Sequence, residues 1–343
     1  MKRIVICSDG TWASPAQATP TNILKLSRGV APNDAHGNKQ VVFYDWGVGT
    51  DRKKVGGGIG GEGIDKNIMD CYRFIVHNYE PGDELFFFGF SRGAYTIRSL
   101  AGFIRNCGLL KREHAEQIPQ AFRLYRKRKP TSHPDAPTAK KYRRDYAVAD
   151  LTPITFMGAF DTVGSLGIPT LYWGLFDDDD EYLFHDTSPS KIVKCVRHAL
   201  SIDENREDFP PTLWKERPNS DIKQVWFSGV HCDIGGGYKE HGLSDIALQW
   251  VLDEAKIHGL VTEAHFLKDI QPDASQRAHN ERKKLYKLRG DHNRGQHNMP
   301  ESPLIHQSVK DRWEAATSRS RSKALKAYFE VHPAFACFFS WSE

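Results

Sequence analysis

The sequence has no long hydrophobic run. None of its apolar stretches reaches the roughly 18 residues that a membrane-spanning helix needs. The apolar segment near its start, Ile4 to Cys7, is also too short for the core of a signal peptide. We therefore expect a protein that is made soluble in the cytoplasm. If it is exported, the route is one that needs no signal peptide.

Paired cysteines and excess charge of one sign are also lacking. The 343 residues include six cysteines with no close pair, which we expect to be reduced core residues: Cys7, Cys71, Cys107, Cys195, Cys232 and Cys337. The formal net charge is only +4, which does not favour a nucleic-acid partner. A chain of this length can form one α/β domain with insertions, or two domains.

The chain does contain a fully apolar run that ends at a serine between two glycines. Leu85 to Phe90 reads as a buried strand, Gly89-Phe90-Ser91-Arg92-Gly93 follows the Gly-x-Ser-x-Gly pattern, and helix-forming sequence comes next. Between a strand and a helix, this pattern is typical of a nucleophile elbow, a turn so tight that both glycine positions exclude a Cβ atom. The alternative is a tight turn whose serine only caps the helix.

Two further predicted strands end in residues that would complete a catalytic triad. The apolar segment 154–160 ends at Asp161, and the segment 224–230 ends at His231. With helical crossovers the strands are parallel, so Ser91, Asp161 and His231 should meet at one edge of the sheet. Serine, acid and histidine follow one another in the chain order of α/β-hydrolases. We therefore predict an α/β-hydrolase-like, doubly wound, mostly parallel sheet.

The turn after the first strand should supply the rest of the site. The backbone N–H of Arg92 would be one oxyanion donor, and the N–H of Gly10 or Thr11 would be the other. Asp9 and Asp233 lie at the same edge, where we expect them to hold loops by accepting backbone N–H groups.

Two alternatives remain at this point. His306 lies late in the chain, where the histidine of such triads usually falls, so it is a second candidate for the base. A metal-dependent phosphohydrolase is the other alternative, in which the Asp and His side chains at the sheet edge would be ligands. The triad itself needs no metal or other cofactor.

Four motifs together carry a family resemblance: SDGTW, GFSRGAY, FDTVGSLG and GVHCDIGGGY. They resemble the catalytic domain of type VI secretion phospholipase effectors and a wider α/β-hydrolase family that shares this domain. The resemblance extends from about Lys2 to Trp313, with Cys232 at a position where the family usually has serine. It implies phospholipase A activity, a lipid or small ester substrate, and Ser91, Asp161 and His231 as the triad. For an effector it also implies a secretion-machinery or immunity protein as partner.

Two segments lie outside these motifs. From Lys111 to Arg144 there are eleven Lys or Arg and three acids, which predicts a basic helical insertion at about 108–150, placed over the sheet like a lid. Such a surface would attract an anionic membrane, whereas the plainer interpretation is a solvated helical face. The catalytic domain should span 1–313. The aromatic-rich segment 314–343 should dock on it or form an oligomer contact, and the alternative is contact with a membrane. Helical spacing of apolar residues predicts an amphipathic helix from Lys191 to Asp203.

Overall fold

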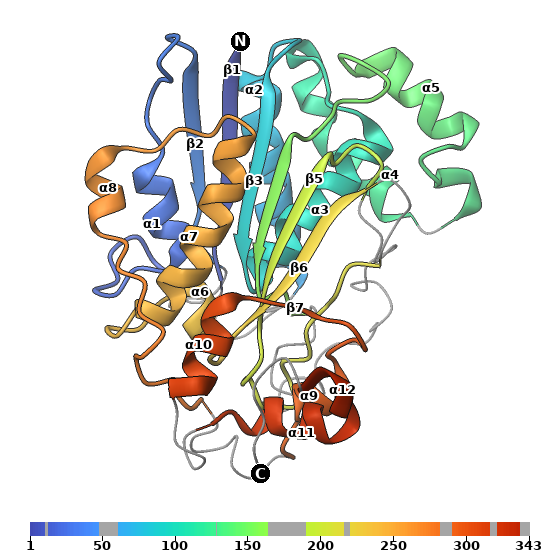
Figure 1. Ribbon diagram of the computed structural model, residues 1–343. Coiled ribbons are helices and arrows are strands. Elements are labelled where there is room, and N and C mark those ends of the chain that lie inside the picture. Colours follow the sequence, from blue (N-terminus) through green and yellow to red (C-terminus); the bar gives the residue numbers. More distant parts are fainter. Residues whose placement is uncertain are drawn as a thin grey trace.

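The structure is a computed structural model, shown as a ribbon in Figure 1. It describes residues 1–10, 13–47, 61–127, 129–163, 190–215, 220–281, 290–315 and 321–336. Thr11, Cys337 and the last residues of the aromatic tail therefore lie outside the described residues. No helix in the described ranges combines the length and the apolar character that a membrane crossing requires.

A seven-stranded sheet in the order β2-β1-β3-β4-β5-β6-β7 forms the centre of the described chain. All of its strand pairs are parallel, as the sequence predicts. The strands are β1 (Lys2–Ser8), β2 (Lys39–Asp45), β3 (Glu84–Phe90), β4 (Phe156–Phe160), β5 (Cys195–Ser201), β6 (Asp221–Phe227) and β7 (Leu304–Ile305). Their carboxyl ends all lie at the lower edge of the sheet in Figure 1.

Helices cover both faces of the sheet, because both faces of its central strands are apolar. On β3, Phe87 belongs to the core cluster beneath α2 and α3, whereas Phe86 and Phe88 belong to the cluster beneath α1 and α7. These four helices are α1 (Asn22–Gly29), α2 (Gly61–Asn78), α3 (Arg92–Cys107) and α7 (Gly242–Ile257). The arrangement is the doubly wound α/β fold that the apolar strands predict. The described cysteines are free, and all but Cys232 are buried, as expected.

The predicted helix from Lys191 to Asp203 is wrong, because this segment contains β5. Each residue of the strand is buried, so its pattern does not alternate between apolar and polar. Arg197 and His198 interrupt the apolar run but find partners on neighbouring elements. Arg197 pairs with Asp221 and Glu254, and His198 accepts a hydrogen bond from the N–H of Thr162. The strands that end at Asp161 and near His231 are thus separated by β5.

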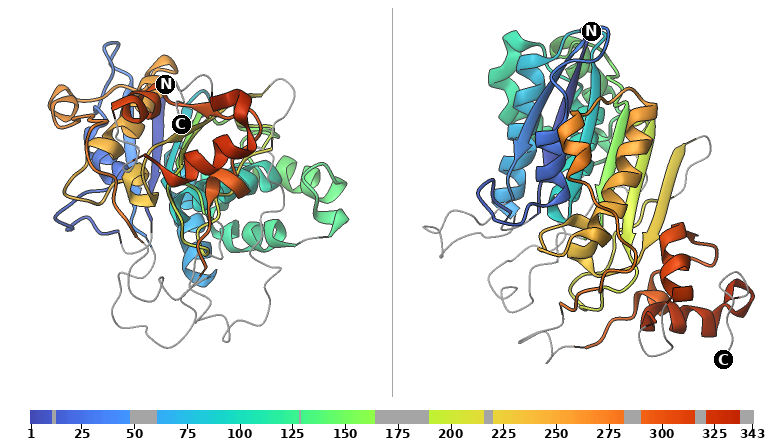
Figure 2. Two further views of the ribbon diagram at one scale, coloured as in Figure 1. Left: turned by 60° about the horizontal axis from the view of Figure 1, so that its bottom comes forward. Right: turned by 60° about the vertical axis from the view of Figure 1, so that its left-hand side comes forward.

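The basic insertion is helical, as predicted, but it does not lie over the active-site edge like a lid. It contains η1 (Arg112–Gln117), α4 (Ile118–Arg126), η2 (Pro130–Ser132) and α5 (Pro137–Tyr146). Figures 1 and 2 show α5 near the amino-terminal ends of the strands. The reason is topological, because the insertion connects the carboxyl end of α3 to the start of β4. Arg143 is buried within it and donates to the carbonyl groups of Asn106 and Pro134.

After β6 the chain first passes the carboxyl edge of the sheet. It then returns with α7 to the amino-terminal edge, where residues 264–268 pack beside α1, and its later helices lie at the carboxyl edge again (Figures 1 and 2). The remaining helices are α6 (His231–Gly235), α8 (Ala264–Lys268), α9 (Arg294–His297), α10 (Gln307–Ala315), α11 (Lys323–Val331) and α12 (Pro333–Ala336). Leu325, Tyr328 and Phe329 of α11 are buried with Trp226 and Trp313 in one hydrophobic cluster. The first half of the aromatic segment is therefore docked on the rest of the described chain. The domain boundary at 313 stays a prediction.

Candidate active site

Ser91 occupies a tight turn between β3 and α3. Its backbone has φ 55° and ψ −121°, a conformation that is costly for a residue with a side chain. The two glycines of the motif make the turn possible. A Cβ on Gly93 would lie 2.0 Å from the carbonyl oxygen of Ser8, and one on Gly89 would lie 2.5 Å from that of Gly93. The nucleophile-elbow geometry expected from the sequence is therefore present.

Asp161 and His231 form a buried hydrogen-bonded pair close to this turn. Asp161 follows β4 with φ 38°, and its Oδ2 lies 2.6 Å from Nδ1 of His231 at the start of α6. The imidazole contacts two aromatic rings, with centroid distances of 4.6 Å to Phe90 and 5.2 Å to Phe209. Since Phe90 directly precedes Ser91, these contacts bring the histidine, its acid and the serine turn together.

Arg294 is a site residue that sequence reasoning missed. It is fully buried on α9, and its guanidinium binds both oxygens of Asp161, at 2.7 and 3.1 Å. The same group also donates to the carbonyl oxygens of Ser201 and Phe209. Burial opposes ionisation of Asp161, but the charge of Arg294 and the hydrogen bond with His231 outweigh it and lower the pKa of this carboxyl. No motif marks Arg294 among the 47 basic residues of the chain.

A second carboxylate, that of Glu204, binds the backbone of His231. Glu204 accepts a hydrogen bond of 3.2 Å from the N–H of His231. Glu204 is itself paired with Arg206 through contacts of 2.8 and 2.9 Å. Burial opposes ionisation of Glu204, but Arg206 reverses the effect and lowers the pKa of its carboxyl. Two buried carboxylates, each with its own arginine, thus surround His231.

The turn after β1 is organised by Asp9. Its carboxylate accepts hydrogen bonds from the hydroxyls of Thr21 and Tyr44 and from the N–H of Gly10, all between 2.5 and 2.7 Å. Desolvation raises the pKa of Asp9 although these three donors oppose the increase. Asp9 therefore holds the turn, as expected. The N–H of Gly10 is engaged in this bond, while Thr11, the other predicted donor, lies outside the described residues.

Asp233 also holds a loop at this edge. Its carboxylate accepts the backbone N–H groups of Val230 and His279, and it contacts Nδ1 of His279 at 2.7 Å. The His279 ring stacks on Tyr238 with a centroid distance of 3.8 Å. Asp233 thus fixes the turn that carries His231, which agrees with the supporting role inferred for it.

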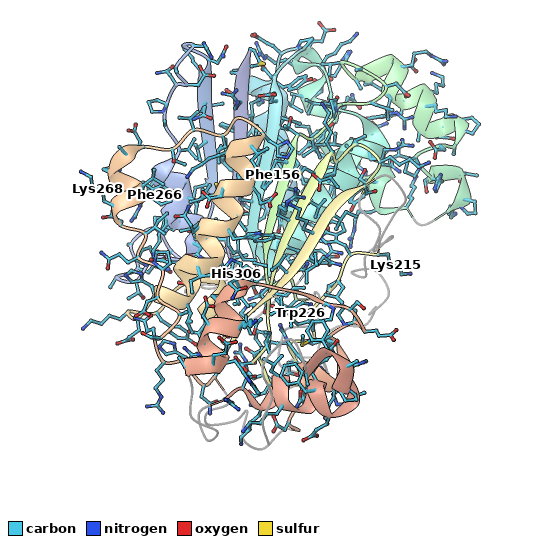
Figure 3. The ribbon with its side chains drawn as sticks, viewed as in Figure 1. Phe156, Lys215, Trp226, Phe266, Lys268 and His306 are labelled. Atoms are coloured by element: carbon cyan, nitrogen blue, oxygen red, sulfur yellow. The ribbon has the colours of Figure 1, made fainter. Side chains whose placement is uncertain are left out.

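The alternative base His306 has other neighbours. It follows β7 at the edge of the sheet, near Trp226 in Figure 3, and its ring stacks on Phe227 with a centroid distance of 4.7 Å. Its Nδ1 contacts the hydroxyl of Ser308 at 2.9 Å. Burial lowers its pKa. The histidine that contacts Asp161 is therefore His231.

Among the residues that the structure describes, the carboxylates of Asp9, Asp161 and Asp233 do not converge on one ion site. Asp9, Asp161 and Asp233 each have separate partners, as described above. Within the described ranges, the three-residue group whose ligand atoms converge lies elsewhere, at Cys195, Asp221 and His258.

A parallel, doubly wound sheet with a serine elbow, an acid and a histidine at its carboxyl edge defines an α/β-hydrolase-type protein. Within that class, the chain belongs to the family described as "T6SS, Phospholipase effector Tle1-like, catalytic domain", whose model matches residues 2–254. The resemblance inferred from the four motifs is thereby confirmed.

Similar proteins include the uncharacterized protein YEL023C of Saccharomyces cerevisiae. It is 30% identical over an alignment of 238 residues that covers 63% of this chain, and the chain spans only 33% of the yeast protein's length. A solved structure of an uncharacterized Pseudomonas aeruginosa protein matches with a TM-score of 0.46 and 16% identity over 80% of this chain and 49% of that one. The Tle1 effector bound to the VgrG spike matches with a TM-score of 0.45 and 19% identity over 70% and 52% of the two chains.

Proposed function

We propose that this chain is a serine hydrolase that cleaves carboxylic esters, with acyl esters of phospholipids as the substrate class. The observation that carries the proposal is the 2.6 Å contact between Asp161 and His231 beside the strained Ser91 turn. This contact matches the acid–base half of a Ser-His-Asp triad. Membership of the phospholipase effector family supports the choice of lipid esters.

The first half of the reaction forms an acyl-enzyme. With Nδ1–H of His231 donating to Asp161, Nε2 carries the lone pair that removes the proton from Ser91 Oγ. The oxygen attacks the ester carbonyl. The developing oxyanion receives the backbone N–H of Arg92 at the start of α3 and a second N–H from Gly10 or Thr11. If Thr11 is the second donor, Gly10 keeps its bond to Asp9.

The second half releases both products. Collapse of the tetrahedral intermediate breaks the ester bond, and the imidazolium of His231 protonates the departing alcohol. For a phospholipid, this alcohol is a lysophospholipid. Water, deprotonated by the same histidine, then attacks the acyl group on Ser91 and frees the fatty acid. The ionised Asp161 stabilises the imidazolium that forms in both steps.

The proposal extends to partners and location. The family supports a lipid surface and a secretion-machinery protein as partners, and an immunity protein if the chain acts as a toxin. Export by a type VI secretion machinery fits the same role. The net charge of +4 is small and does not favour a nucleic-acid partner.

The test is a panel of soluble esters and phospholipids with distinguishable acyl chains. Ser91→Ala should fold normally and lower kcat by about 10⁴ or more. Ser27→Ala, on α1, is a matched control that should keep full activity. If Ser91→Ala stays within about tenfold of wild type, the serine mechanism is wrong.

A chelator separates this proposal from the metal-dependent phosphohydrolase. Ester hydrolysis should persist after exhaustive chelation, because the proposed chemistry uses protein groups alone. Loss of activity in chelator, its recovery with a divalent ion, and cleavage of phosphate esters instead of carboxylic esters would favour the metal enzyme.

A further inference from the structure

Three potential metal ligands converge at the amino-terminal edge of the sheet. Cys195 and Asp221 are the first residues of β5 and β6 and are direct partners across the two strands. His258 lies just after the end of α7. One ligand atom from each residue lies within 4.8 Å of the others. Thiolate, carboxylate and imidazole are the three side-chain ligands of Zn²⁺ in proteins.

From this arrangement we propose that Cys195, Asp221 and His258 bind a divalent, borderline-soft metal ion, Zn²⁺ in particular, with water at the fourth position. A thiolate and an imidazole select Zn²⁺ over Mg²⁺ or Ca²⁺, which prefer oxygen ligands throughout. Cys195 is buried whereas Asp221 is exposed, so the thiolate would lie on the protein side and the water on the solvent side.

The neighbours of the three ligands form a suitable second layer. Arg197 holds the Asp221 carboxylate through two contacts of 2.8 and 3.0 Å, which orients it without using all of its lone pairs. Glu254 binds both Arg197 and Lys223 and offsets their positive charges next to the site. The His258 ring packs against Phe156, with a centroid distance of 5.7 Å, which limits its rotation.

Metal binding must displace the thiol proton. A cysteine thiol is mostly protonated at neutral pH, whereas the thiolate is the form that binds a metal ion. Each Zn²⁺ ion bound should therefore form one Zn–S bond and release one proton to the solvent. This exchange of a proton for a metal ion changes no oxidation state, so it needs no oxidant or reductant.

The site is separate from the proposed triad. Cys195 and Asp221 begin their strands, whereas Ser91, Asp161 and His231 follow strand ends at the opposite edge. Figure 3 shows Phe156, whose ring contacts His258, above Trp226, which lies near the carboxyl end of β6. The ion would link β5, β6 and α7 and stabilise the folded chain without taking part in catalysis.

The experiment uses Co²⁺ as a spectroscopic probe on the full chain after removal of metals. Wild type should bind one ion, show a thiolate-to-Co²⁺ charge-transfer band, release one proton per ion and melt at a higher temperature. Zn²⁺ should abolish the band by displacement. Cys195→Ala should lack the band, and His258→Ala should bind at least tenfold more weakly.

Cys71→Ala removes another buried cysteine, and His265→Ala removes an exposed histidine on α8, so both controls should behave like wild type. The proposal is overturned if wild type shows no thiolate band, or if the band persists in Cys195→Ala. It is also overturned if His258→Ala binds as tightly as His265→Ala, a comparison that holds even if the cysteine variant does not fold.

Discussion

At the scale of single residues, backbone strain coincides with the proposed chemistry. Among the described residues other than glycine, Ser91 and Asp161 are the two with positive φ. Such conformations cost about 1–3 kcal/mol each and persist where the surrounding structure imposes them. Here Gly93 lets the elbow approach β1, and Arg294 fixes the carboxylate of Asp161. The strain lies on two members of the proposed triad.

Arg294 should act as a positioning residue through Asp161. Arg294→Met leaves a buried carboxylate without its cation, so the pKa of Asp161 should rise and its orientation should loosen. We expect kcat to fall about a hundredfold and the acid-side loss of kcat/KM to begin at a higher pH. The measurement is the pH profile of ester hydrolysis.

Arg294→Lys should recover part of this activity, since it restores the charge but not the two-pronged contact. Arg143→Met removes a buried arginine from the insertion and is the matched control. If Arg294→Met and Arg143→Met lower activity equally with an unchanged pH profile, Arg294 has only a structural role.

At the scale of elements, the sequence predicts the structures that nearby residues determine. It does not predict those that depend on partners far away in the chain. The elbow, β3 and β4 follow from apolar runs and glycine spacing within a few residues. β5 was missed because Arg197 and His198 are buried through partners on other elements, including Glu254, which lies 57 residues away. Arg294 was missed for the same reason, since Asp161 lies 133 residues away. No local pattern reports such pairs.

The basic insertion carries exposed lysines, among them Lys127, Lys129 and Lys140. Neutralising Lys127, Lys129 and Lys140 to glutamine should weaken binding to anionic vesicles by about 3 kcal/mol in total. Hydrolysis of a short soluble ester should not change, because the residues of the proposed triad and their hydrogen-bond partners lie on other elements. Vesicle co-sedimentation at low salt measures the difference.

Three exposed lysines elsewhere provide the control with equal charge change: Lys39, Lys215 and Lys268. Equal binding by both triple variants would mean that the insertion is an ordinary solvated face.

At the scale of the whole molecule, helix α11 supports the proposed site although it lies far from the strands in sequence. α11 packs against α9, the short helix that carries Arg294. Gly295 permits this contact, because a Cβ there would lie 1.9 Å from the carbonyl oxygen of Ala324. Ser322, at the start of α11, also bonds to Asp203, which accepts the N–H of Gly229 close to His231.

Gly295→Ala should therefore reduce both stability and activity. Overpacking should cost about 1–3 kcal/mol of unfolding free energy, and movement of α9 should lower kcat by displacing Arg294. Urea unfolding and ester hydrolysis measure the two effects. Gly290→Ala is the control, since its Cβ would meet only the end of the Glu207 side chain at 3.1 Å. A destabilised Gly295→Ala with wild-type kcat would show that the docking does not extend to the triad.

The buried His198 should make stability depend on pH. Burial, with the nearby charge of Arg98, lowers its pKa to about 3, whereas the unfolded chain should titrate near 6.5. The unfolded state therefore binds more protons between these values, and stability falls as the pH falls. From about pH 8 to pH 5 this histidine should remove about 2 kcal/mol of unfolding free energy. His198→Gln, which keeps an acceptor for the N–H of Thr162, should lose that part of the pH dependence in urea titrations.

The central claim is that Ser91 is a nucleophile activated by His231. The most direct measurement is to treat the protein with a fluorophosphonate, digest it, and locate the adduct by mass spectrometry. The account predicts a single adduct, on Ser91, formed at the rate at which ester hydrolysis is lost, and slower by several orders of magnitude in His231→Ala. Full loss of hydrolysis with the adduct on another residue, or continued hydrolysis by protein fully modified at Ser91, would contradict it.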